Sequence, residues 1–275
     1  MNVIHVLFYI AVFFYASAFV AYIMHLFLEK ELIGRCYALL LLLGFVLQSI
    51  SVSWRTYEIL QEPFWDLLYS LSIFCWTLAF LSLILQTRVR MRLLAGFVLF
   101  VTLLFSLLIF IIPKTTRSVI PSFNAFWFGT HILFSFAGYA AFIIAFLSGI
   151  LYILLEKQIK KKSSGFLFHS LPSLGSLEMI NYRSLSVGLG LLALGLAFGV
   201  LWGRWEKVML PWYDPKIVTT VITLIFYSCI VYVRWSSRWR GKIVAYISIV
   251  GFLFILMIYF TVHYISKGHI YLSAP

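Results

Sequence analysis

The segment WGRWEKVMLPWYDPK, residues 202–216, lies between two long apolar runs and contains three tryptophans, one tyrosine, two prolines and five charged residues. Lipid cannot solvate so many charges, so we expect this segment at a membrane surface. Its aromatic residues are typical of an interfacial belt. They are equally typical of a flat apolar shelf edged by cations, which suits a planar ligand that carries carboxylates.

The whole chain has the composition of a polytopic membrane protein. Of its 275 residues, 63% are hydrophobic and 11% are charged, and the mean hydropathy is +1.02. A soluble domain of this length could not bury so much apolar surface. The net charge of +12 indicates orientation in a bilayer, because no Lys/Arg cluster is interleaved with exposed aromatics on a soluble element. We therefore expect contact with lipid and none with nucleic acid.

Apolar runs of about twenty residues predict an all-α polytopic membrane bundle of about eight transmembrane helices. Neither an internal repeat nor a linker divides the chain, so we expect a single domain over residues 1–275. The first run lacks a basic start and a small-residue cleavage site, and we interpret it as a retained span. The predicted helices are 3–28, 37–54, 64–86, 93–112, 126–155, 184–203, 216–234 and 243–264.

Basic residues gather in alternate connections of this bundle. Roughly fourteen of the 21 Lys and Arg residues lie in the connections 30–35, 88–92, 157–183 and 234–242. The positive-inside rule places these connections in the cytoplasm, so both termini and segment 202–216 should face outward. We expect a multi-pass protein of the cytoplasmic (inner) membrane whose functional face is extracytoplasmic. The Phe/Leu content of connection 156–183 predicts a segment lying along the inner membrane surface.

Two histidines are predicted to share the outer layer with segment 202–216. His131 lies near the outer end of the fifth helix, with Ser135 and Gly138 on the same face, which leaves a notch for a broad group. His269 follows the eighth helix, and His263 lies about a turn inside it, so either is a candidate for the second position.

Two neutral imidazoles are a standard axial pair for haem iron, and tryptophan and tyrosine would cover the faces of the macrocycle. Arg204, Lys207 or Lys216 would then meet its propionates. The alternative is that these histidines lie at an interface because histidine is amphipathic. His5 and His25, in the first helix, are expected to bond to neighbouring groups instead.

Five further features are segments that follow one another along the chain: PFWDLLYSLSIFCWTL (63–78), THILFSFAGYAAF (130–142), LPSLGSLEMINYR (171–183), GVLWGRWEKVMLPWYDPK (199–216) and YISKGHIYL (264–272). Together they resemble the cytochrome c assembly family, the CcsA/CcmC/HemX group of haem-handling membrane proteins.

The resemblance implies a protein that holds or exports haem b (iron protoporphyrin IX) at the outer face of the membrane for delivery to apocytochrome c. It implies a ResB/CcsB-like membrane partner and a role as the haem-handling subunit of a cytochrome c synthetase (haem lyase) complex. His131 and His269 match the family's axial ligands in position. The residues that would lie against the haem are Trp202, Trp205, Trp212, Tyr213 and Asp214.

Some positions depart from the family pattern WGxxWxWDPKE. Tyr213 stands where the last tryptophan is expected, Pro211 occupies another aromatic position, and no acid follows Lys216. Tyr232 matches the place of a histidine that many CcsA-type members carry near the cytoplasmic end of the next helix. These departures favour an alternative, a HemX-like membrane regulator of haem biosynthesis whose partner is a haem-biosynthesis enzyme.

Overall fold

Eight α-helices account for almost all of the residues that the computed structural model describes. Within the described residues, the structure gives the backbone alone at positions 60–61, 64–65, 67, 118–119, 125, 215–216 and 258–272. Contacts between residues divide the chain into two compact units, Met1–Ala125 and Phe126–Pro275. The single domain over 1–275 stays a prediction. The described residues are 3–61, 64–65, 67–88, 91–111, 118–119, 125–162, 171–205, 215–236 and 241–272.

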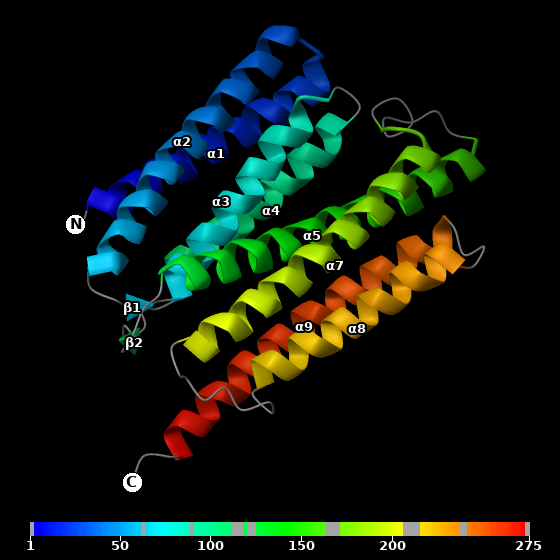
Figure 1. Ribbon diagram of the computed structural model, residues 1–275. Helices are drawn as coiled ribbons and strands as arrows, with labels where there is room; N and C mark the ends of the chain where they lie inside the picture. The colour runs from blue at the N-terminus through cyan, green and yellow to red at the C-terminus, as the bar shows by residue number, and fades with distance from the viewer. Residues whose placement is uncertain are drawn as a thin grey trace. The chain divides into compact units, whose positions relative to one another are not determined.

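Unit 1 contains four helices, coloured blue to cyan in Figure 1. Two strands of two residues each, β1 (Phe64–Trp65) and β2 (Ser118–Val119), pair antiparallel. The helices are α1 (Val3–Leu28), α2 (Glu31–Gln61), α3 (Leu67–Gln86) and α4 (Arg92–Ile111).

A buried glutamine joins three helices of unit 1. Gln48 on α2 is fully buried. Its Oε1 accepts a hydrogen bond of 2.6 Å from the Tyr15 hydroxyl on α1, and its Nε2 donates to the Ser72 carbonyl on α3 at 3.0 Å. Gly44, one turn earlier on α2, makes room for the Tyr15 ring, because an added Cβ would lie 2.7 Å from it. Apolar lipid offers these polar groups no alternative partners, so the bonds stabilise this particular packing.

Unit 2 contains the other four helices, which run from green to red in Figure 1. Phe142 on the first of them stacks on Tyr227 of the third, with ring centroids 4.0 Å apart, and Phe146 packs on Phe252 of the fourth at 4.8 Å. The helices are α5 (Ala125–Lys160), α7 (Leu174–Trp205), α8 (Pro215–Ser236) and α9 (Lys242–Leu272).

Polar side chains tie these four helices together towards the end where α7 begins. Asn181 on α7 donates from Nδ2 to the Ala145 carbonyl on α5 at 2.6 Å and to the Ser248 hydroxyl on α9 at 2.8 Å. Glu178, also on α7, accepts a 2.7 Å charged hydrogen bond from Arg234 on α8. Each contact connects residues far apart in sequence, so together they determine which helices are neighbours.

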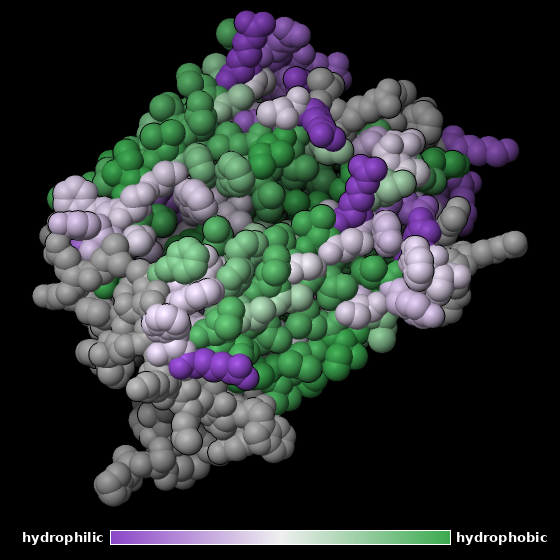
Figure 2. Space-filling model, in the orientation of Figure 1, coloured by the Kyte–Doolittle hydropathy of each residue, from purple (hydrophilic) through white to green (hydrophobic). Residues whose placement is uncertain are grey.

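The prediction of an all-α, multi-span bundle is confirmed. Seven helices are long and apolar enough to cross a membrane, and the described part of α9 adds the shorter apolar stretch Lys242–Met257. Figure 2 shows apolar residues covering much of the visible helix surface, with strongly hydrophilic residues mainly near helix ends. Such a distribution suits helices whose middles lie in lipid. The sides of the membrane that the termini face stay a prediction.

The connection 156–183 differs from expectation. Helix α5 continues to Lys160, and residues 174–183 form the first turns of the 32-residue helix α7, so the prediction of a surface-lying segment is wrong for them. The Ser173 side chain accepts a hydrogen bond from the backbone N–H of Ser176, which caps the start of α7. The buried Asn181 then requires polar partners that only neighbouring helices provide. Residues 163–170 lie outside the described residues.

Candidate functional site

One end of unit 2 brings together the start of α5, the end of α7, the start of α8 and the end of α9. His131, near the start of α5, contacts Gly195 and Gly199 towards the end of α7, so these two helices are antiparallel. At the opposite end, Glu178 near the start of α7 pairs with Arg234 near the end of α8. In Figure 1 the four ends lie on the same side of the unit. We call this end of unit 2 the His131 end.

His131 is half-buried and is held by the backbone of α7. Its Nδ1 lies 2.7 Å from the carbonyl oxygen of Gly195, a residue 64 positions further along the chain. A carbonyl oxygen only accepts hydrogen bonds, so Nδ1 carries the proton. In the neutral ring, Nε2 is then the nitrogen with the free lone pair. It has no hydrogen-bond partner among the described residues.

The notch expected beside His131 is filled by α7. A Cβ added at Gly138 would lie 3.0 Å from the backbone nitrogen of Leu192, and one added at Gly195 would lie 2.9 Å from the backbone nitrogen of Ser135. Small residues on both helices thus allow the two backbones to approach closely. The small face of α5 serves helix packing, and the expectation of an open notch there is wrong. The Nε2 of His131 remains the group with capacity to bind a ligand.

Aromatic side chains surround this contact. Trp202 on α7 packs against Phe128 on α5 with ring centroids 5.0 Å apart, and Trp127 faces Phe198 at 6.0 Å. Trp202 Nε1 is buried and has no hydrogen-bond partner among the described residues. Gly199, which touches His131, and Trp202 are about one helical turn apart on α7.

The tryptophan-rich segment is divided among different structural elements. Trp202, Arg204 and Trp205 belong to the last turn of α7, where Arg204 is exposed and Trp205 is 67% exposed. Trp202 packs against α5, so it does not form one flat surface with Trp205. Trp212, Tyr213 and Asp214 lie outside the described residues. Lys216 and His269 are described only as backbone positions of α8 and α9.

The position of α9 along α7 indicates which α9 histidine lies closer to the level of His131. Helices α7 and α9 run in the same direction, and Asn181 lies level with Ser248 because their side chains are hydrogen-bonded. Fourteen residues beyond Asn181, α7 reaches Gly195, and the same distance beyond Ser248 brings α9 to the residue before His263. The backbone of His269 lies six residues beyond that of His263, or about 9 Å further along the helix axis at about 1.5 Å per residue. On this register, His263 lies nearer than His269 to the level of the imidazole contact.

The described residues fit an axial haem ligand at His131. Imidazole is a common ligand of haem iron, and the Gly195 bond leaves the required lone pair on Nε2. Among the described residues no three His, Cys, Asp or Glu side chains form a metal-binding group, as a zinc site would need. A bis-imidazole site requires two nitrogen ligands only.

The other described histidines have local contacts. His25 Nδ1 lies 3.0 Å from the carbonyl of Lys30, five residues away, at the turn between α1 and α2. His5 stacks on Tyr9 one turn away, with ring centroids 6.4 Å apart. The His25 contact confirms the expectation that it bonds to a neighbouring group, whereas the same expectation for His5 stays a prediction. His169 lies outside the described residues.

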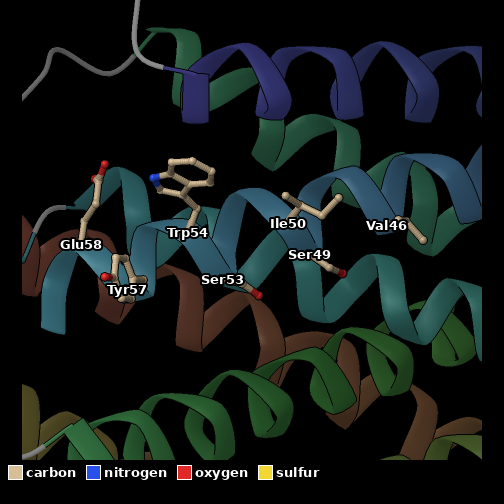
Figure 3. Close-up of a pocket in the computed structure, with 7 residues that line it drawn as sticks. All are labelled: Val46, Ser49, Ile50, Ser53, Trp54, Tyr57 and Glu58. Atoms are coloured by element: carbon tan, nitrogen blue, oxygen red, sulfur yellow. The ribbon is translucent and has the colours of Figure 1, made fainter.

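A groove of about 810 Å³ runs along α2 in unit 1 (Figure 3). Two of its polar side chains, Ser49 and Glu58, already have partners. The Ser49 hydroxyl accepts a hydrogen bond from Trp76 Nε1 and donates to the Phe45 carbonyl, and Glu58 pairs with Arg55 at 2.9 Å. We therefore assign no ligand to it. Its lining residues are Val46, Ser49, Ile50, Ser53, Trp54, Tyr57 and Glu58.

Gly195 and Gly199 were not among the residues predicted from the sequence. The signal that could have revealed them is the glycine series 188, 195 and 199, with spacings of seven and four residues. These spacings place the three glycines on one helix face, which is typical of a close helix–helix contact. The sequence alone gave no reason to pair that face with His131.

The fold and the site define a multi-span helical membrane protein in which an imidazole nitrogen, His131 Nε2, can bind a ligand at one end of the second unit. The family profile described as Cytochrome C assembly protein matches residues 64–270. The chain belongs to this cytochrome c assembly family.

Curated relatives agree with this assignment. Protein HemX of Bacillus subtilis (strain 168) is 25% identical over 261 residues, which cover 93% of each chain. The cytochrome c biogenesis protein CcsA of Guillardia theta is 26% identical over 246 residues, or 80% of this chain and 79% of the relative. CcsA of Prochlorococcus marinus (strain MIT 9301) is 27% identical over 234 residues, or 75% of this chain and 74% of the relative. Both kinds of relative are similar over most of the chain.

Proposed function

We propose that this protein binds haem b at the extracytoplasmic face of the cytoplasmic membrane and holds or exports it for delivery to apocytochrome c. The observation that carries the proposal is the 2.7 Å contact between His131 Nδ1 and the Gly195 carbonyl, which leaves Nε2 with a free lone pair. Family membership supports a role in cytochrome c assembly. In this role haem is the cargo, and the protein acts by holding it in a defined position.

The proposal gives each candidate residue a part. His131 supplies one axial imidazole, and a histidine near the end of α9 supplies the other. The resemblance favours His269, whereas the register of α9 supports His263. Trp202, Trp205, Trp212, Tyr213 and Asp214 would lie against the macrocycle, and Arg204 and Lys216 would meet its propionates.

Membership of the family supports a proposal for the partners. We propose a ResB/CcsB-like membrane protein and apocytochrome c as partners, with this chain as the haem-handling subunit of a cytochrome c synthetase complex. The distribution of Lys and Arg supports an outward His131 end, because twelve of the 21 Lys and Arg residues lie within 88–92, 157–183 and 234–242.

An absorption spectrum of detergent-purified protein tests haem binding. We expect a b-type spectrum with two imidazole ligands, and we expect His131→Ala to lose it while the protein still inserts into the membrane. His25→Ala is the matched control, because His25 bonds a local carbonyl. Retention of the spectrum by His131→Ala would refute the ligand assignment. Comparing His263→Ala with His269→Ala identifies the second ligand as the one whose loss abolishes the spectrum.

A second candidate function is a HemX-like membrane regulator of haem biosynthesis that contacts a haem-biosynthesis enzyme. Two observations favour it. The similarity to Bacillus subtilis HemX extends over 93% of each chain. Tyr232, which replaces a histidine of many CcsA-type members, is 62% exposed on α8, so it does not point into the core of unit 2.

Deletion of the gene separates the two functions. Loss of c-type cytochromes with normal levels of early tetrapyrrole enzymes would support the assembly function. Normal c-type cytochromes with altered levels of those enzymes would support regulation and contradict haem delivery. Complementation with the intact gene controls for effects on neighbouring genes.

A further inference from the structure

We propose that Gly195 and Gly199 of α7 are positioning residues that set the tautomer and the direction of the His131 imidazole for iron binding. The inference rests on the proposed function, because it assumes that Nε2 of His131 binds haem iron. It adds a role for two residues that neither bind haem nor carry a side chain.

Gly195 acts through its carbonyl. Within α7 this oxygen already accepts the helical hydrogen bond from the N–H of Gly199, and its second lone pair is available to His131 Nδ1 at 2.7 Å. The missing side chain is what lets α5 come so close. A Cβ at position 195 would lie 2.9 Å from the backbone nitrogen and 3.1 Å from the Cα of Ser135.

Gly199 acts through the space it leaves. A Cβ at this position would lie 2.7 Å from His131 Nδ1 and 3.0 Å from Cε1, and the three nearest atoms all belong to that imidazole. Such separations are shorter than van der Waals contact, so an alanine would push the ring away from Gly195. The ring is the mobile end of a side chain, so we expect it to turn while the two backbones stay in place.

The hydrogen bond to Gly195 affects how well His131 can bind a metal. Histidines that bind metals generally donate the other ring N–H to a carbonyl or carboxylate, which fixes the tautomer, orients the ring and increases its basicity. Among the described residues, the Gly195 carbonyl is the hydrogen-bond partner of His131 Nδ1. An imidazole that lost the Gly195 bond would no longer be held with Nε2 as the acceptor.

Three alanine variants separate positioning from packing. Gly199→Ala disturbs the imidazole. Gly138→Ala disturbs α5–α7 packing away from it, because its Cβ would lie 3.0 Å from the Leu192 nitrogen and 3.1 Å from the Gly188 carbonyl oxygen. Gly190→Ala, also on α7, has no atom within 4 Å of the added Cβ and is the matched control.

Haem titration of the folded fraction of each variant is the first measurement. We expect Gly199→Ala to weaken haem binding by about 10- to 100-fold, the usual effect of losing a partner of a metal-binding histidine. Gly190→Ala should match the unaltered protein. Gly138→Ala should reduce the yield of folded protein, with an unchanged spectrum for the part that folds. Equal affinities for Gly199→Ala and Gly190→Ala, or equal losses for Gly199→Ala and Gly138→Ala, would overturn the proposal.

The tautomer of His131 in haem-free protein is the second measurement. Nitrogen NMR of histidine-labelled protein, with the signal assigned by His131→Ala, should show the proton on Nδ1. A proton on Nε2 would overturn the positioning role. The test of the proposed function has a separate outcome. Haem retained by His131→Ala would contradict the ligand assignment. Haem lost by His131→Ala but retained by Gly199→Ala would contradict only the positioning role of Gly199.

Discussion

His25 and His131 illustrate how the same side chain serves different purposes. Each has Nδ1 within 3.0 Å of a backbone carbonyl oxygen. His25 bonds a residue five positions away and so stabilises the turn between α1 and α2. His131 bonds a residue 64 positions away on another helix. Only the second contact couples the orientation of an imidazole to the packing of two helices, which is why it carries the functional proposal.

The buried pair Tyr15–Gln48 is a second place where one residue decides local stability. Tyr15→Phe removes the 2.6 Å hydrogen bond to Gln48 and leaves a buried acceptor unpaired. Hydrogen bonds between membrane helices average about 0.6 kcal/mol and reach about 1.7 kcal/mol. We expect a loss of unfolding free energy in that range, measured by denaturation in detergent.

Tyr9→Phe is the matched control for this variant. Tyr9 lies on the same helix, stacks on Phe110, and its hydroxyl has no hydrogen-bond partner among the described residues. It should change stability by much less than Tyr15→Phe. Equal effects of the two changes would contradict a specific contribution from Gln48.

At the scale of elements, α7 has contacts with all three other helices of unit 2. With 32 residues it is about 48 Å long, which exceeds the roughly 30 Å thickness of a hydrocarbon core. Glu178 and Asn181 near its start bind α8, α5 and α9, and Gly195 and Gly199 near its end face α5. The helix thus connects the cluster of polar contacts at one end of the unit to the His131 end.

The ion pair Glu178–Arg234 should contribute more to stability than an exposed pair. Its side chains are 19% and 15% exposed, and Arg234 also lies over the Tyr182 ring at 5.3 Å. We expect a double-mutant cycle with Glu178→Gln and Arg234→Gln to give a coupling energy of about 0.5–3 kcal/mol, the range for contacting residues in one network.

The exposed pair Glu31–Arg35 provides the comparison. Its side chains are 87% and 80% exposed and 3.5 Å apart on one helix, so its coupling should be about 0.3–0.5 kcal/mol. A coupling for Glu178–Arg234 no larger than this would show that the pair does not hold α7 to α8.

At the scale of the whole molecule, the distribution of charge predicts orientation. The net charge is +12, and most Lys and Arg residues lie in alternate connections. Alkaline phosphatase is active only outside the cytoplasm. We expect fusions ending after Arg88 to be inactive and fusions ending after Trp205 to be active, as the positive-inside rule requires. A green fluorescent protein fused at the same residues should show the opposite pattern. Active fusions at Arg88 would reverse the orientation and place the His131 end in the cytoplasm.

Much of the fold could be predicted because membrane insertion depends on local sequence. A run of about twenty apolar residues is enough to span a bilayer wherever it occurs, so eight helices followed from hydropathy. The error in connection 156–183 arose where composition and capping conflict. Its Phe/Leu content suggested a surface segment, but the Ser173 cap starts α7 at Leu174.

His131 could be singled out from the sequence because small residues follow it on the same helix face and because it shares the predicted outer layer with segment 202–216. The packing of its ring against α7 could not be predicted from the sequence. Lipid and neighbouring helices are equally apolar, so hydropathy does not distinguish a helix face that meets lipid from one that meets another helix. Ser135 and Gly138 therefore suggested an open notch, although α7 fills it.

The sequence by itself determined that this chain is a multi-span helical membrane protein with a histidine near the start of its fifth helix, because both depend on residue type and local spacing. Only the tertiary structure decided that the Gly195 carbonyl accepts a hydrogen bond from that imidazole and that Gly199 leaves room for the ring. That contact joins residues 64 positions apart, so it exists only once two antiparallel helices pack closely together.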